Sequence, residues 1–253
     1  MELSSEFWWF ILIGLSAQLV DGALGMAFGL VSSSVMLSMG VPPAQVSASV
    51  HTAEVFTTGA SGVSHLVAGN VDRRLFLRLA VPGAIGGAVG AYGLTQLPGD
   101  LIRPLIYLYL LVLAIVILFR AAGRWMPKGD IRRVPLLGLF AGVCDATGGG
   151  GWGPIATSTL LARGGQARTT IGTVNAAEFV VTLTISATFL MSMGLQHLQI
   201  VAGLLIGGMM AAPLAALLVK RVKERWVLVA VGLLLLGISL YQVGHAVYGY
   251  VGR

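Results

Sequence analysis

The chain has 253 residues, of which 56% are hydrophobic and 10% are charged, and its formal net charge is +6. Soluble domains carry about 25% charged residues, so this composition excludes an ordinary soluble domain and predicts an all-α polytopic membrane protein. The single cysteine, Cys144, excludes an internal disulfide and a cysteine metal cluster. The basic residues lie in short loops between apolar runs, which indicates membrane topology rather than nucleic-acid binding.

Two of the predicted apolar segments are interrupted by glycine-rich stretches. In chain order the segments are 7–39, 44–68, 75–97, 102–120, 134–162, 169–193, 198–219 and 226–249. One span needs about 20 residues, so the first and fifth segments are too long for a single span. Asp21–Gly29 interrupts the first, and Asp145–Pro154, with four consecutive glycines, interrupts the fifth. Consecutive glycines disfavour a continuous helix, and Pro154 fits the first turn of a new one.

The two halves of the chain repeat each other at an offset of 124 residues. The repeat predicts an N-terminal repeat at 1–120, a cytoplasmic linker at 121–133 and a C-terminal repeat at 134–253. Each repeat is expected to be a glycine-broken helical hairpin followed by three transmembrane helices, and paired halves are typical of secondary transporters. The matched pairs are Gly14 with Gly138, Ala17 with Ala141, Asp21 with Asp145, Gly25 with Gly149, Gly29 with Gly153, Val50 with Val174, Ala53 with Ala177, Glu54 with Glu178 and Thr58 with Thr182.

The loop charges predict that the two repeats are inverted in the membrane. If each broken segment is a hairpin that enters and leaves on one side, all of the 16 Lys and Arg residues except Arg103 and Arg253 fall on one face. Basic loops lie on the cytoplasmic side, so this arrangement is favoured over one that counts each broken segment as a single span. It places both termini on the extracytoplasmic side of the membrane.

The two glycine-rich breaks are predicted to meet near the membrane midplane and to form an anion site. The second arm of each hairpin presents backbone N–H groups at a helix N-terminus, where anions bind, and successive glycine N–H groups can form a nest for an anion. The alternative is that the glycines only allow close helix packing. Asp21 and Asp145, which open the breaks, either cap the second arms or take part in binding substrate or an ion.

Glu54 and Glu178 lie in mid-segment, where a carboxyl group is costly and usually functional. Residues three apart share a helix face, so His51 lies beside Glu54 and Asn175 beside Glu178. The acids are expected to carry protons or form a gate, or else to be hydrogen-bonded struts between helices. His51 is either a proton acceptor or anion ligand or an ordinary buried histidine, and Trp152 and the hydroxyls of Thr57, Thr58, Thr147 and Thr182 lie in the same regions.

These features define a candidate substrate site and leave a second function open. Four acids and a histidine are also suited to a divalent metal-cation transporter or channel. No Walker, HExxH or GxSxG motif is present, so neither an enzyme nor a cofactor is expected. The candidate substrate-binding residues are Asp21, Gly22, Gly25, His51, Glu54, Thr58, Asp145, Thr147, Gly148, Gly149, Gly150, Trp152, Asn175 and Glu178.

The sequence around the second break resembles a motif of a known protein family. The stretch from Gly138 to Pro154, which contains Asp145-Ala-Thr-Gly-Gly-Gly-Gly-Trp-Gly-Pro154, is similar to the second glycine-rich motif of the TauE/SafE sulfite exporter family, and the resemblance covers essentially the whole chain. It implies transport of sulfite, sulfonates or related organosulfur anions across the inner membrane, as export that is not driven by ATP.

The resulting hypothesis is a secondary transporter that works by alternating access. The anion is expected to bind between the hairpin tips at Gly22–Gly25 and Gly148–Gly151, while Glu54 or Glu178 takes a proton. The expected partners are the small anionic substrate, the lipid bilayer and protons as coupling ion, without nucleic acid.

Overall fold

The computed structural model describes residues 7–24, 26–123, 133–163, 165–194, 198–218 and 224–251. These residues form α-helices and one π-helical turn, with no strand among them, which confirms the predicted all-α class. The elements are α1 (Phe7–Leu24), α2 (Phe28–Ser38), α3 (Pro43–Val67), α4 (Arg73–Gln96), α5 (Gly99–Ala121), α6 (Val134–Gly148), the π-turn η1 (Gly153–Thr157), α7 (Ser158–Ala162), α8 (Ala167–Met193), α9 (Leu198–Leu218) and α10 (Glu224–Val251).

Both long apolar segments are broken, but each break begins later than predicted. α1 continues past Asp21 to Leu24, and α6 continues past Asp145 to Gly148. The second break has a clear local cause, because Gly149 adopts φ +69° and Gly150 adopts φ +153°. These values disfavour residues with a side chain, and both backbone N–H groups donate to the carbonyl oxygen of Asp145, which ends the helix.

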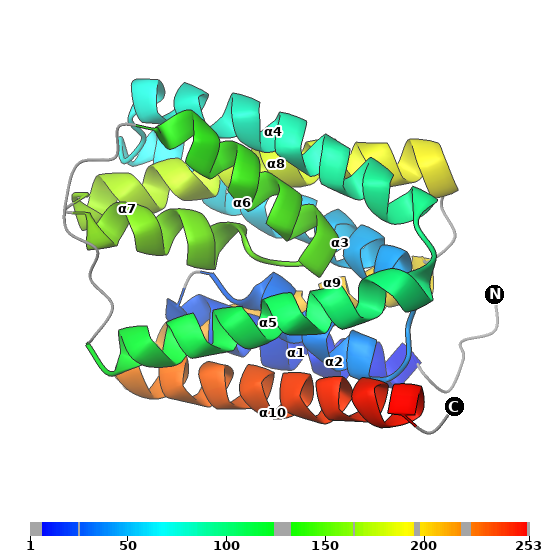
Figure 1. Cartoon of the computed structure of the whole chain (residues 1–253). Helices are drawn as coiled ribbons and strands as arrows, with labels where there is room; N and C mark the ends of the chain where they lie inside the picture. Colours follow the sequence, from blue (N-terminus) through cyan, green and yellow to red (C-terminus); the bar gives the residue numbers. More distant parts are fainter. Residues whose placement is uncertain are drawn as a thin grey trace.

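The helices of the two halves pack on each other in reciprocal pairs. At the offset of 124 residues α1 corresponds to α6, α3 to α8, α4 to α9 and α5 to α10. α1 of the first half packs on α9 of the second half. Their counterparts, α6 of the second half and α4 of the first, also pack on each other. α3 and α8 pack on each other, as do α5 and α10. Figure 1 shows the resulting bundle, in which α5 and α10 run side by side along one edge.

The pairs α4–α6 and α1–α9 are packed backbone against backbone. A Cβ atom at Gly86 of α4 would lie 2.1 Å from the carbonyl oxygen of Leu139, and one at Gly207 of α9 would lie 2.0 Å from that of Ile11. Small residues of this kind let membrane helices approach closely. The glycines in these two pairs therefore hold one half of the chain to the other.

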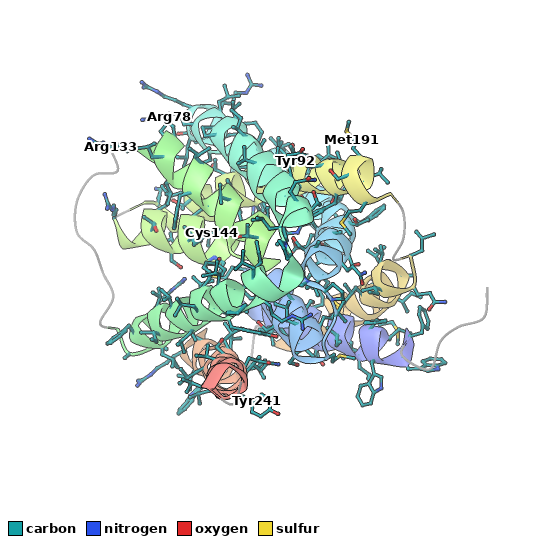
Figure 2. The ribbon with its side chains drawn as sticks, turned by 45° about the vertical axis from the view of Figure 1, so that its right-hand side comes forward. Arg78, Tyr92, Arg133, Cys144, Met191 and Tyr241 are labelled. Carbon is teal, nitrogen blue, oxygen red and sulfur yellow. The ribbon has the colours of Figure 1, made fainter. Side chains whose placement is uncertain are left out.

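The outer surface of the bundle is apolar, as a lipid-facing surface requires. Figure 2 shows Tyr92, Met191 and Tyr241 directed away from the bundle, and Met191 is 88% exposed. Arg78 and Arg133 lie near each other at one end of the molecule (Figure 2). Among the described residues three helical stretches are long and apolar enough to cross a membrane: Arg73–Gln96, Leu101–Ala121 and Arg168–Met193.

Replacing Gly86 by alanine is expected to destabilise the protein, because the new Cβ atom would overlap the Leu139 carbonyl oxygen on α6. Overpacking a tight contact costs about 1–3 kcal/mol, so the thermal unfolding temperature in detergent or nanodiscs should fall. The matched control is Gly93→Ala on the same helix, where a Cβ atom meets nothing within 4 Å. Equal unfolding temperatures for both variants would contradict the close α4–α6 contact.

Candidate functional site

Each helix break is closed by an aspartate that reaches forward to the start of the next helix. Oδ1 of Asp21 accepts the backbone N–H of Ala27 at 2.7 Å and that of Phe28 at 3.2 Å. Oδ1 of Asp145 accepts the backbone N–H of Trp152 at 3.0 Å. Phe28 and Trp152 are counterparts in the two repeats, so the same capping bond occurs twice. It satisfies N–H groups that a helix start leaves free.

The two breaks meet backbone to backbone. A Cβ atom at Gly150 would lie 2.4 Å from the backbone of Gly29 and Leu30, and one at Gly29 would lie 2.8 Å from the carbonyl oxygen of Gly149. The glycine loop also wraps the ring of Tyr109 on α5, whose hydroxyl donates to the Gly150 carbonyl oxygen at 3.4 Å. Contact this close leaves no space for a ligand between Gly29 and Gly150.

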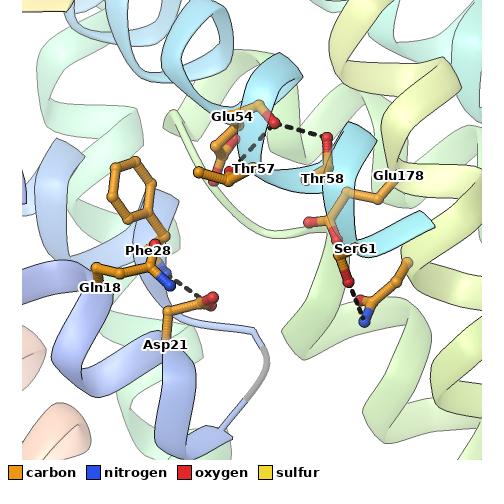
Figure 3. A pocket seen from close by; sticks show the side chains of 9 residues that line it. Gln18, Asp21, Phe28, Glu54, Thr57, Thr58, Ser61 and Glu178 are labelled. Carbon is orange, nitrogen blue, oxygen red and sulfur yellow. Dashed lines mark hydrogen bonds between the residues drawn. The ribbon is translucent and has the colours of Figure 1, made fainter. Parts of the chain in front are cut away.

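A pocket of about 250 Å³ lies beside this contact, between the two halves of the chain. Figure 3 shows Asp21 of α1, Glu54 of α3 and Glu178 of α8 around the same space. The other lining side chains are uncharged. Among the described residues the lining consists of Gln18, Asp21, Phe28, Glu54, Thr57, Thr58, Ser61, Asn175 and Glu178.

The two counterpart glutamates of the pocket have different surroundings. Glu54 is 6% exposed, and its carboxyl group is hydrogen-bonded by the backbone N–H of Gly29 in the first turn of α2. Glu178 is half-buried, and within the described part of the chain its carboxyl group receives no hydrogen bond. Glu54 is therefore fixed to a helix start, whereas Glu178 is presented to the pocket.

His51 and Asp145 form a buried pair outside the pocket lining. Nε2 of His51 lies 3.2 Å from Oδ2 of Asp145, and Nδ1 lies 2.8 Å from the carbonyl oxygen of Ser47. Since a carbonyl oxygen only accepts, Nδ1 carries a proton and donates it to Ser47. The pair links α3 to α6 and orients the carboxyl group that caps the second break.

Five predicted residues line the pocket, namely Asp21, Glu54, Thr58, Asn175 and Glu178. His51, Asp145, Thr147, Gly148, Gly149, Gly150 and Trp152 are not in its lining, and Gly25 lies outside the described residues. Gly22 lies in the last turn of α1. Trp152 is fully buried and donates its ring N–H to the Val174 carbonyl oxygen at 3.1 Å. Thr147 donates to the carbonyl oxygen of Val143 at 2.8 Å.

Sequence reasoning did not include Gln18, Phe28 and Ser61, and it named Thr57 only as a hydroxyl in the same region and not as a candidate binding residue. Ser61 follows Glu54 by seven residues, so Glu54, Thr57, Thr58 and Ser61 form one polar stripe along α3. That periodicity could have identified Ser61. Gln18 stands three residues before Asp21 on the same face of α1, which is a weaker signal.

A sequence model of the family described as "Sulfite exporter TauE/SafE" matches residues 10–242. A "Probable membrane transporter protein YtnM" of Bacillus subtilis is 46% identical over 233 residues, which cover 88% of this chain and 78% of the relative. A "Probable membrane transporter protein ORF9" of Sinorhizobium sp is 28% identical over 128 residues, covering 46% of this chain and 47% of that protein. No solved structure matches.

Replacing Asp145 by alanine is expected to destabilise the protein, because in a buried site the N–H of Trp152 loses its acceptor and Nε2 of His51 loses its hydrogen-bond partner. An unpaired buried polar group costs about 1–3 kcal/mol. Asp145→Asn, which keeps an oxygen for the Trp152 N–H, should lose less. Thermal unfolding of both variants measures the difference, and an alanine variant as stable as the wild type would show that the cap contributes little.

Proposed function

The chain belongs to the sulfite exporter TauE/SafE family of membrane transporters, and from this premise we propose that it is a secondary transporter of a small sulfur-containing anion. The anion is sulfite, a sulfonate or a related organosulfur anion. Transport is export across the cell inner membrane and is coupled to protons. The family membership supports transport by a membrane protein, and the pocket supplies the argument for coupling.

The charge of the pocket lining is the observation that supports proton-coupled transport. Three carboxyl side chains line about 250 Å³, and among the described residues no Lys, Arg or His lines it with them. Two like charges 4 Å apart repel by about 4 kcal/mol at an effective dielectric constant of about 20. An anion is therefore accepted only when one or more of the acids are protonated, and a protonated acid donates a hydrogen bond to an anion oxygen.

Glu178 is the acid best suited to carry the proton. Its carboxyl group faces the pocket and has no hydrogen bond from the described residues, whereas those of Asp21 and Glu54 accept backbone N–H groups at the start of α2. A carboxylate that accepts such N–H groups is stabilised in its charged form. Glu178 lacks that stabilisation, and protonation changes its role from acceptor to donor.

We further propose that the repeats are inverted and that alternating access proceeds by movement of one half against the other. The reciprocal pairs α1–α9 and α6–α4 support a two-fold relation between the halves. The hydroxyls of Thr58 and its counterpart Thr182 lie 3.2 Å apart, as expected for residues beside such an axis. With the basic loops on the cytoplasmic side, residues 1–120 and 134–253 form the two repeats and both termini are extracytoplasmic.

A metal-cation transporter is the second candidate, because three carboxyl groups in one pocket also suit a cation. Within the described residues no group of three or more His, Cys, Asp or Glu side chains is close enough to hold a metal ion. The anion is therefore preferred. Flux of sulfite, sulfate, a sulfonate and a divalent cation into proteoliposomes, with and without a pH gradient, separates the two candidates.

Glu178→Gln is expected to lower pH-driven sulfite flux in proteoliposomes by at least about tenfold, because glutamine retains the size of the side chain but cannot exchange a proton. Glu54→Gln tests the second acid in the same way. The matched control is Thr184→Ala, a change on the same helix at a hydroxyl that donates to the Val180 carbonyl oxygen outside the pocket. Full pH-dependent transport in both glutamine variants would falsify the coupling role of these acids.

A further inference from the structure

A chain of polar side chains runs from the pocket to one end of the bundle. Asn175, which lines the pocket, places its side-chain nitrogen 3.4 Å from Nε2 of His65. Nδ1 of His65 lies 3.2 Å from the side-chain nitrogen of Asn70. The oxygen of that Asn70 amide accepts a hydrogen bond from the guanidinium group of Arg168, which also donates to the Ala68 carbonyl oxygen at 3.1 Å.

This contact depends on a glycine in α8. A Cβ atom at Gly172 would lie 2.6 Å from the carbonyl oxygen of Asn70 and 3.0 Å from Nδ1 of His65. The loop after α3 is held to α8 a second time, because the backbone N–H of Asp72 donates to the hydroxyl of Thr173 at 2.9 Å. Asn70 is thus held between Arg168 and the histidine ring.

The orientation of the Asn70 amide determines which nitrogen of the His65 ring accepts a hydrogen bond and which carries the proton. Arg168 has donors only, so the Asn70 oxygen faces Arg168 and the Asn70 nitrogen donates to Nδ1 of His65. Nδ1 is then an acceptor without a proton, and the neutral ring carries its proton on Nε2. A doubly protonated ring would place two donors against each other at Asn70, unless the Asn70 amide turned and lost its bond to Arg168.

Charged groups near the ring come from α8 and from the loop after α3. From α8 the guanidinium group of Arg168 lies on the Asn70 side of the ring. In the loop, the carboxyl group of Asp72 accepts the backbone N–H groups of Arg74 and Leu75 at the start of α4. Glu178 stands one helical turn beyond Asn175, in the pocket.

We propose that His65 is a positioning residue for the anion, an inference that rests on the proposed function. With its proton on Nε2, the ring needs an acceptor at the position where the structure has the nitrogen of Asn175. A half-turn of the Asn175 amide places its oxygen there without changing the shape of the side chain, and the ring donates to that oxygen. The oxygen then also accepts the hydroxyl of Ser61, which lies 3.4 Å from the same amide atom as the ring. The N–H₂ group of Asn175 is thereby directed to the pocket as a donor for an anion oxygen.

The device occurs once and has no counterpart under the 124-residue repeat. The counterparts of His65, Asn70 and Arg168 are Phe189, Gly194 and Ala44, which cannot form it. The counterpart of Asn175 is His51, which is held by Asp145 and does not line the pocket. Asn175 is therefore the amide donor that the second repeat contributes, and its orientation matters for selecting an anion over a cation.

The test combines a spectrum with a binding measurement on the full-length protein in nanodiscs. Long-range ¹H–¹⁵N spectra of protein labelled at histidine report which ring nitrogen carries the proton, and His65→Gln assigns the signals of His65. In the wild type we expect the His65 proton on Nε2 alone. In Arg168→Gln, where the Asn70 amide is free to turn, we expect that the Nε2-protonated tautomer is no longer the only one. A wild-type ring protonated on Nδ1, or on both nitrogens, overturns the proposal.

Sulfite binding is measured by calorimetry on the same samples. His65→Leu is expected to raise the Kd of sulfite about tenfold, the effect of losing one hydrogen bond to a charged group. His65→Gln, whose amide can still donate to Asn175, should restore most of the affinity, and Arg168→Gln should weaken binding without altering the pocket lining. Ser64→Ala, at an exposed hydroxyl on the same helix that donates to the Ala60 carbonyl oxygen, serves as the control.

The outcomes separate the positioning role from the proposed function. If the wild type binds sulfite or a sulfonate and both His65→Leu and Arg168→Gln bind it equally well, the positioning role is wrong and the proposed function stands. If the wild type binds none of these anions, the proposed function fails together with the inference that rests on it. Thermal unfolding shows whether His65→Leu is folded, and Arg168→Gln, changed at an exposed residue, keeps the test decisive if it is not.

Discussion

A helix that stops inside an apolar layer leaves backbone N–H groups that lipid cannot satisfy, and this constraint governs the centre of the protein. Asp21 and Asp145 meet it by reaching across a break to the first N–H groups of the next helix. Glu54 adds a third acceptor at Gly29. The helix-start N–H groups that sequence reasoning assigned to an anion are thus bonded to acidic side chains of the protein itself, while those of Gly149 and Gly150 donate to the Asp145 carbonyl oxygen.

Because the helix starts are satisfied internally, the two breaks can pack against each other. Gly29 and Gly150 touch backbone to backbone, and the space for a ligand lies to one side, between α1, α3 and α8. The pocket therefore combines residues of both halves without being lined by the glycine loop. In the proposed transport cycle, a shift of one half against the other would change the pocket and the contact between the breaks together.

In the proposed function, the pocket would bind an anion through groups that are formally of the wrong sign. Its three acids would exclude an anion when ionised and donate to it when protonated, so the charge of the substrate and the protonation of the acids would be linked. Neutral donors would then be decisive, because they attract anion oxygens whether or not the acids are protonated. Asn175 and Gln18 offer side-chain amides of this kind, one from each half.

The amino-acid sequence by itself determined the membrane class, the apolar segments, their two breaks and the 124-residue repeat, because hydrophobicity and glycine content act locally along the chain. It also identified Asp21, Glu54, Thr58, Asn175 and Glu178, since polar groups in apolar segments stand out. Only the tertiary structure decided which of the repeated residues share a pocket. Asp21 and Asp145 have the same motif, yet Asp145 is bonded to His51 while Asp21 faces the pocket. Asn175, the counterpart of His51, lies within hydrogen-bond distance of Ser61 and His65 instead, because helix packing brings different partners within reach in the two halves.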